Sequence, residues 1–147
     1  MKDFKLNEAK SDVEKLLKYV PWLEAKQGEI VSRIYSDNDL SKTTVTFPVY
    51  DATLLSFVNE ARDTKLMDTN YHYVYSDKFI KSYSDELKVI EAATVKTSGD
   101  VCAILSRYVL KGMTKGSVWQ EGITYGIYLA ALLKLKKLLE IWDAPLA

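Results

Sequence analysis

Apolar residues recur at helical spacing over most of the chain. Apolar side chains three and four residues apart share one face of a helix, whereas strict alternation is typical of a strand. The helical stripes are Val13, Leu16, Leu17 and Val20; Leu54, Leu55, Phe57 and Val58; Leu87, Ile90 and Ala93; and Val101, Ile104, Leu105, Tyr108 and Val109. Ser84 and Ser98 stand where the helices of the third and fourth stripes would begin. A short helix is also predicted over 21–27.

A final helix is predicted from near Ser117 to about Trp142. Between 123 and 135 apolar residues lie on nearly every side of it, which is typical of a central helix surrounded by others. Gly122, Gly126 and Ala130 recur every fourth residue along this segment. Such a line of small residues favours another helix crossing at close range, and a self-association face is the alternative.

Three segments depart from the helical pattern. In TTVTFPVY the apolar residues alternate, which predicts a short extended or β element near residues 44–50, and Pro48 would confine it to a sheet edge. Residues 29–35 fit either a helix or a strand. Residues 66–83 stay unassigned, because Tyr71, Tyr73 and Tyr75 alternate as in a strand whereas the residues before them suggest turns.

The fold predicted for residues 1–147 is therefore a mainly α single domain. It would be a bundle of about five or six helices around a central C-terminal helix. A length of 147 residues suits one domain with one core, and no Pro-, Gly- or Ser-rich linker divides the chain.

The charges of the chain limit the partners that can be expected. The 20 basic and 20 acidic residues cancel, so no global field would attract nucleic acid or an anionic membrane, and both are disfavoured as partners. The N-terminal segment lacks the apolar core of a signal peptide, and the longest apolar stretch is too short to span a bilayer. We therefore expect a cytoplasmic protein.

Catalytic chemistry finds little support in the sequence. His72 is the only histidine and Cys102 the only cysteine, which disfavours a zinc site and a disulfide. His72 is interpreted as a structural or surface residue, and Cys102 as a buried small hydrophobe. The carboxylates at 85, 86 and 91 fit a solvated helix face. We predict no catalytic residues, no metal and no cofactor.

The best candidate site is the basic turn RYVLKGMTKGSVWQEG, residues 107–122. It lacks the spacing of a phosphate-binding P-loop, and Gly112 and Gly116 are explained by a corner between two helices. A helix start nonetheless presents free backbone N–H groups to an anion. The predicted anion-binding residues are Arg107, Lys111, Lys115, Ser117 and Trp119.

Three stretches together resemble a bacterial family of uncharacterised small proteins. They are FPVYDATLLSF, ILSRYVLKGMTKGSVW and the G-x-x-x-G spacing followed by LLKLKKLLE, within about residues 45–140. The family's turn carries an arginine beside an aromatic residue, where this chain has Gly112 and Met113. The resemblance implies a bacterial relative, and it implies no function because the family has no established activity.

Two functions follow as hypotheses. The first is a non-enzymatic helical interaction or regulatory module, with a protein partner or a second copy of the chain. The alternative is a protein that binds a small anion or a nucleotide at the basic turn.

Overall fold

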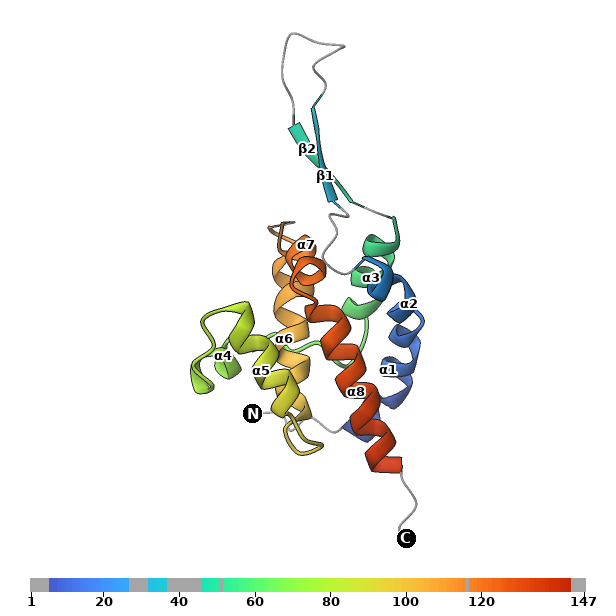
Figure 1. Cartoon of the computed structure of the whole chain (residues 1–147), viewed down its shortest axis with the longest axis vertical. Helices are drawn as coiled ribbons and strands as arrows, with labels where there is room; N and C mark the ends of the chain where they lie inside the picture. The colour runs from blue at the N-terminus through green and yellow to red at the C-terminus, as the bar shows by residue number, and fades with distance from the viewer. Residues whose placement is uncertain (1–5, 27–31, 37–45, 51, 116, 144–147) are drawn as a thin grey trace.

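The computed structural model describes residues 6–26, 32–36, 46–50, 52–115 and 117–143, and it is mainly α-helical, as predicted. The described residues form one 3-10 helix, eight α-helices and two strands (Figure 1). In chain order they are η1 (Leu6–Ala9), α1 (Lys10–Leu17), α2 (Val20–Lys26), β1 (Ser32–Ser36), β2 (Thr46–Tyr50), α3 (Ala52–Arg62), α4 (His72–Asp77), α5 (Tyr83–Ala92), α6 (Ser98–Lys111), α7 (Ser117–Thr124) and α8 (Ile127–Asp143).

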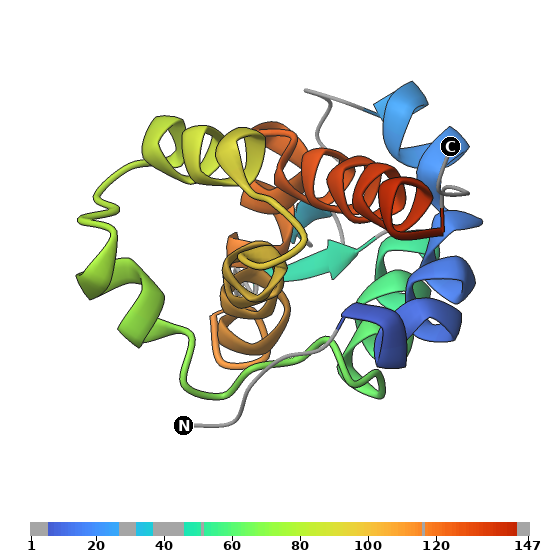
Figure 2. The ribbon, with the colours of Figure 1, turned by 90° about the horizontal axis from the view of Figure 1, so that it is seen from below.

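Helix α8 lies at the centre of the bundle, which confirms the predicted central C-terminal helix. It packs against α1, α2, α5, α6 and α7. Its residues Ile127, Tyr128, Leu132 and Leu135 are fully buried, because apolar side chains point from it toward several neighbours. In Figure 2 the end of α8 lies between the N-terminal helices on one side and α5 on the other.

The two strands form an antiparallel hairpin at one end of the helices (Figure 1). Strand β2 falls within the predicted extended element near 44–50. Residues 32–35, which fitted either a helix or a strand, belong to strand β1. Residues 29–31, 44 and 45 are outside the described part. Pro48 is opposite Ile34 in the register. A proline is tolerated there because each strand of a two-stranded sheet is an edge strand.

The number of helices exceeds the predicted five or six for two reasons. The unassigned segment 66–83 contains α4, and the last helix is divided into α7 and α8. The division falls at Gly126, whose φ of 70° is a left-handed conformation that glycine adopts without steric cost. The prediction of one helix from Ser117 to about Trp142 was therefore wrong at this bend.

Candidate functional site

A buried carboxylate joins three helices. Glu86 on α5 is only 3% exposed, and its two carboxylate oxygens accept hydrogen bonds from the hydroxyls of Tyr75 on α4 and Tyr108 on α6. The expectation that residue 86 belongs to a solvated helix face was therefore wrong. A buried carboxylate is stable only when it is hydrogen-bonded or paired with a charge, and here both conditions are met.

The charge that accompanies Glu86 is Arg107 on α6. One guanidinium nitrogen of Arg107 lies 3.7 Å from a Glu86 carboxylate oxygen. The guanidinium also lies over the rings of Tyr75 and Tyr108, at 5.6 and 5.0 Å from their centroids, which adds cation–π attraction. We call these four residues, Glu86, Tyr75, Tyr108 and Arg107, the Glu86 cluster.

The Glu86 cluster lines a hollow of about 360 Å³, which we call the tyrosine hollow. Its outer wall includes Tyr83 on α5 and Tyr125 at the end of α7, whose rings stack in parallel with centroids 4.3 Å apart. Lys81 and Glu121 also line the hollow. The hollow thus combines aromatic walls with two basic and two acidic side chains.

Burial raises the pKa of four phenols, and in three of them a hydrogen bond to a neighbouring carboxylate adds to the effect. Desolvation and then the bond to Glu86 raise the pKa of Tyr75 and of Tyr108 far above the ordinary value of 10.0. Desolvation does the same for Tyr128. Desolvation followed by the bond to Glu60 raises the pKa of Tyr19 to about 12.

We expect the protein to lose stability steeply as the pH rises above about 10. A raised pKa in the folded state means that folding favours the neutral phenol, so this stabilisation is complete below the unfolded pKa of about 10 and is lost above it. Each such tyrosine contributes a slope of about 1.4 kcal/mol per pH unit. Urea unfolding between pH 8 and 11.5, with tyrosinate absorbance followed in parallel, measures it.

Tyr19→Phe is the control for this pH dependence. The variant removes one of the four phenols, so its free energy of unfolding should fall less steeply between pH 10 and 11.5. A free energy of unfolding that stays flat through this range in the unsubstituted chain would contradict the expectation.

Trp119, from the basic turn, is hydrogen-bonded to the end of α6. The Trp119 indole N–H donates to the carbonyl oxygen of Val109 at 2.9 Å, and so satisfies an acceptor in the last turn of the helix. A Cβ on Gly112 would lie 2.0 Å from the Trp119 ring. Gly112 has an ordinary helical φ of −62°, so glycine is required here by the close approach of the ring.

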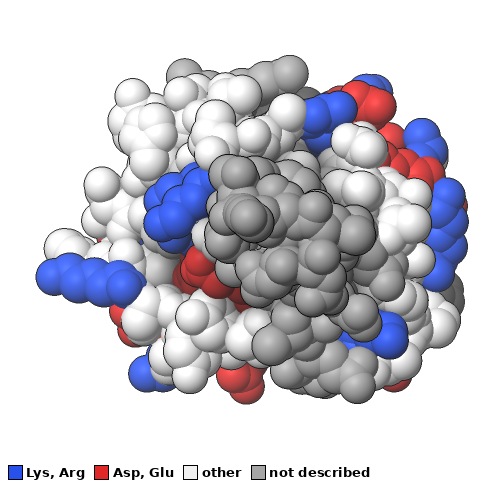
Figure 3. Space-filling view, turned by 90° about the horizontal axis from the view of Figure 1, so that it is seen from above, with Lys and Arg blue, Asp and Glu red and all other residues white. Residues whose placement is uncertain are grey.

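The five predicted anion-binding residues are not gathered around one cavity. Only Arg107 lines the tyrosine hollow, whereas Trp119 is bound to α6, and Lys111, Lys115 and Ser117 are exposed. Gly116 lies outside the described residues. Seen from the hairpin end, the described basic side chains visible in Figure 3 lie apart, with acidic ones among them.

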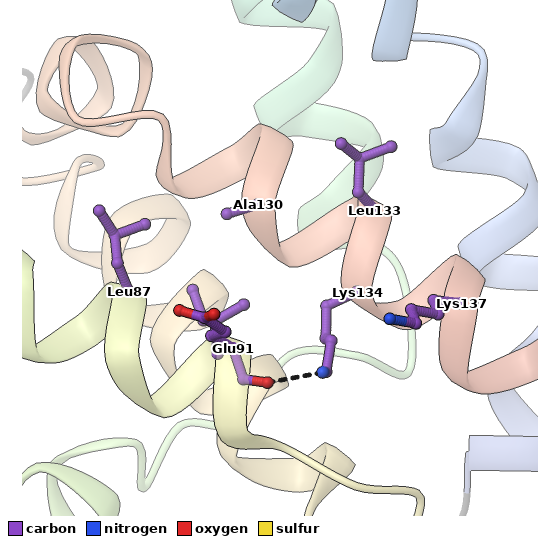
Figure 4. Close-up of a pocket in the computed structure, with 7 residues that line it drawn as sticks. Leu87, Glu91, Ala130, Leu133, Lys134 and Lys137 are labelled. Atoms are coloured by element: carbon purple, nitrogen blue, oxygen red, sulfur yellow. Dashed lines mark hydrogen bonds between the residues drawn. The ribbon is translucent and has the colours of Figure 1, made fainter.

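The predicted helix-packing residues have three separate surroundings. A Cβ on Gly122 would meet the buried ring of Tyr128 at 2.2 Å, so the close neighbour is a side chain of the next helix. Gly126 forms the bend between α7 and α8. Ala130 lines a groove of about 370 Å³ between α5 and α8 (Figure 4).

The groove between α5 and α8 has apolar walls formed by Leu87 and Leu133, and Leu133 is 41% exposed. Lys134 Nζ donates to the backbone oxygen of Glu91 at 2.7 Å, the interaction dashed in Figure 4. Lys134 therefore satisfies a backbone acceptor near the end of α5. Lys137 is the other basic residue on the wall of the groove.

Neither Cys102 nor His72 is among the residues that line the hollow. Cys102 is buried, and burial raises the pKa of its thiol, so the thiolate is disfavoured. His72 is exposed at the start of α4, with its ring 4.6 Å from that of Tyr73. Within the described ranges, no three His, Cys, Asp or Glu side chains are placed to hold a metal ion.

Comparisons with family models, curated proteins and solved structures find no match for this chain. The resemblance to a bacterial family therefore stays a prediction. None of the helices in the described part of the chain is long and apolar enough to cross a membrane.

Proposed function

We propose that this protein is a non-enzymatic interaction module that binds a protein partner through the aromatic corner between α4 and α5. We define the aromatic corner as Tyr73, Phe79 and Tyr83, whose side chains are 62%, 78% and 49% exposed. In both Figure 1 and Figure 2 the turn between α4 and α5 stands out from the side of the bundle. A projecting surface with exposed rings suits contact with another molecule.

The backbone at Phe79 is the observation that carries the proposal. Helix α4 ends in a Schellman motif, in which the Ile80 N–H donates to the Tyr75 oxygen at 3.0 Å and the Phe79 N–H donates to the Ser76 oxygen at 3.4 Å. The motif requires a left-handed residue at position 79, where glycine is the usual choice, and Phe79 has a φ of 55°. A bulky side chain in this conformation costs about 1 to 2 kcal/mol.

No packing within the bundle compensates for this cost, because the Phe79 ring is mostly in solvent. Strained and exposed residues of this kind are concentrated at functional sites. A protruding aromatic ring is a suitable anchor for an apolar recess on a partner, since aromatic anchors supply much of the binding energy at interfaces. The partner we propose is therefore a protein with such a recess.

Phe79→Gly should abolish partner binding while it leaves the fold as stable or more stable. Glycine relieves the left-handed strain of about 1 to 2 kcal/mol but adds about 0.5 to 1 kcal/mol of unfolded-state entropy, so we expect a net gain of roughly 0.5 kcal/mol. Phe79→Ala keeps the strain and removes the ring, and it should lose binding equally. Urea unfolding gives the stability, and affinity capture from a bacterial lysate gives the binding.

Ile141→Ala is a matched control, because Ile141 is also exposed, at 56%, but lies at the far end of α8. A protein captured by the unsubstituted chain and by Ile141→Ala, but by neither Phe79 variant, would support the proposal. Light scattering that shows a dimer lost in Phe79→Gly would identify a second copy as the partner. Capture unchanged in Phe79→Gly would refute the aromatic corner as the binding surface.

A further inference from the structure

The geometry points to a second site: we infer that the tyrosine hollow binds a small zwitterion of the amino-acid type. Its carboxylate would lie at Arg107 and its ammonium group at Glu121. The hollow has about 360 Å³, which is within the range of pockets that hold small molecules. Tyr83 belongs to both the aromatic corner and the wall of the hollow, so the tests below use Arg107 and Glu121, which lie outside the corner, and either proposal can fail without the other.

Arg107 offers hydrogen-bond donors to the hollow. Its contacts with the described residues are the 3.7 Å ion pair with Glu86 and the two ring contacts, and none of these is a hydrogen bond. Within the described part, no buried side-chain nitrogen or oxygen lacks a hydrogen-bond partner, so the guanidinium N–H groups must reach solvent. A guanidinium whose ring contacts fix its plane suits a carboxylate, which it can bind through two parallel hydrogen bonds.

Glu121 offers the opposite charge. It lies on α7, is partly buried and lines the same hollow. Its side chain makes no ion pair or hydrogen bond with the described residues. A partly buried carboxylate with free acceptor oxygens favours an ammonium group over an anion.

The balance of charge selects a ligand that carries both signs. The wall carries two basic side chains, Arg107 and Lys81, and two acidic ones, Glu86 and Glu121. Both oxygens of Glu86 already accept hydrogen bonds from tyrosine hydroxyls, which leaves Glu121 to meet an ammonium group. A ligand with net charge would face a like charge on one side of the hollow, whereas a zwitterion has a partner for each end. The stacked rings of Tyr83 and Tyr125 give the rest of the ligand an apolar wall.

Thermal-shift measurements of the full chain with each of the common L-amino acids test the inference. At least one amino acid should raise the Tm, and isothermal titration should then give its affinity. The amide of that amino acid lacks the carboxylate and its N-acetyl derivative lacks the ammonium group, so each should bind at least tenfold more weakly. No shift with any amino acid, or an amide that binds as tightly as its parent, would overturn the inference.

Glu121→Gln locates the site without disturbing the Glu86 cluster. It should weaken binding at least tenfold, whereas Glu140→Gln, an exposed change on α8, should leave the affinity unchanged. Arg107→Lys keeps the positive charge but loses the planar pair of donors, and should also weaken binding about tenfold. Circular dichroism confirms that each variant is folded. Affinity unchanged in a folded Glu121→Gln variant would overturn the placement in this hollow.

Discussion

Replacing Glu86 by alanine is expected to lower the free energy of unfolding by about 3 to 5 kcal/mol, the cost of breaking a buried charge pair. The substitution leaves the hydroxyls of Tyr75 and Tyr108 without their acceptor and Arg107 without its counter-charge. Arg107 is 24% exposed and can be partly hydrated, so we expect the lower end of this range. Urea unfolding at neutral pH measures the change.

Two further substitutions separate the roles of the Glu86 carboxylate. Glu86→Gln keeps one acceptor oxygen but loses the charge, so its cost should lie between zero and that of Glu86→Ala. Glu91→Ala, on the same helix but with an exposed side chain, should change stability by less than about 0.5 kcal/mol. If Glu86→Ala costs no more than Glu91→Ala, the Glu86 cluster does not hold α4, α5 and α6 together.

The elements that could be predicted are those whose local signals agree with their packing. For α6, a serine at the start and an apolar stripe along one face predicted a helix from Ser98 to a stop at Gly112, and the helix spans Ser98–Lys111. The buried α8 could be predicted because apolar residues lie on nearly every side of it, which only a central helix can satisfy.

Helix α4 could not be predicted, because contacts far along the chain stabilise it. The alternating tyrosines 71, 73 and 75 resemble a strand, and the helix has no buried residue to give a stripe. It is held by the bond from Tyr75 to Glu86 and by an ion pair from Lys78 to Asp100 at 3.8 Å. Tertiary contacts of this kind override a short local pattern.

Arg107 was predicted to bind an anion together with Lys111 and Lys115, because these lysines follow it within about two helical turns. The structure pairs it with Glu86, which is distant in sequence. One signal was available: Glu86, Ile90 and Ala93 have helical spacing, and all three are buried. A carboxylate on the apolar stripe of a helix predicts a buried partner. The tyrosine hollow could not be predicted as long as Glu86 was assigned to a solvated helix face.

Gly122→Ala is expected to destabilise the fold by about 2 to 3 kcal/mol, although alanine is the better helix former by about 1 kcal/mol. The new Cβ would lie 2.2 Å from the Tyr128 ring. That ring cannot move aside, because Tyr128 is fully buried, its hydroxyl donates to the Trp119 oxygen at 3.1 Å, and it meets Phe57 edge-on at 4.9 Å. Thermal and urea unfolding measure the loss.

A double-mutant cycle shows whether the clash with Tyr128 is the cause. Tyr128→Leu removes the ring and should cost stability by itself, since it leaves space beside Phe57. Adding Gly122→Ala to it should then cost much less than in the unsubstituted chain, with a coupling energy of about 1 to 2 kcal/mol. Additive effects would mean that Gly122 is required for some other reason. A large coupling would show that Gly122 is required because a side chain there would clash with the Tyr128 ring of the next helix.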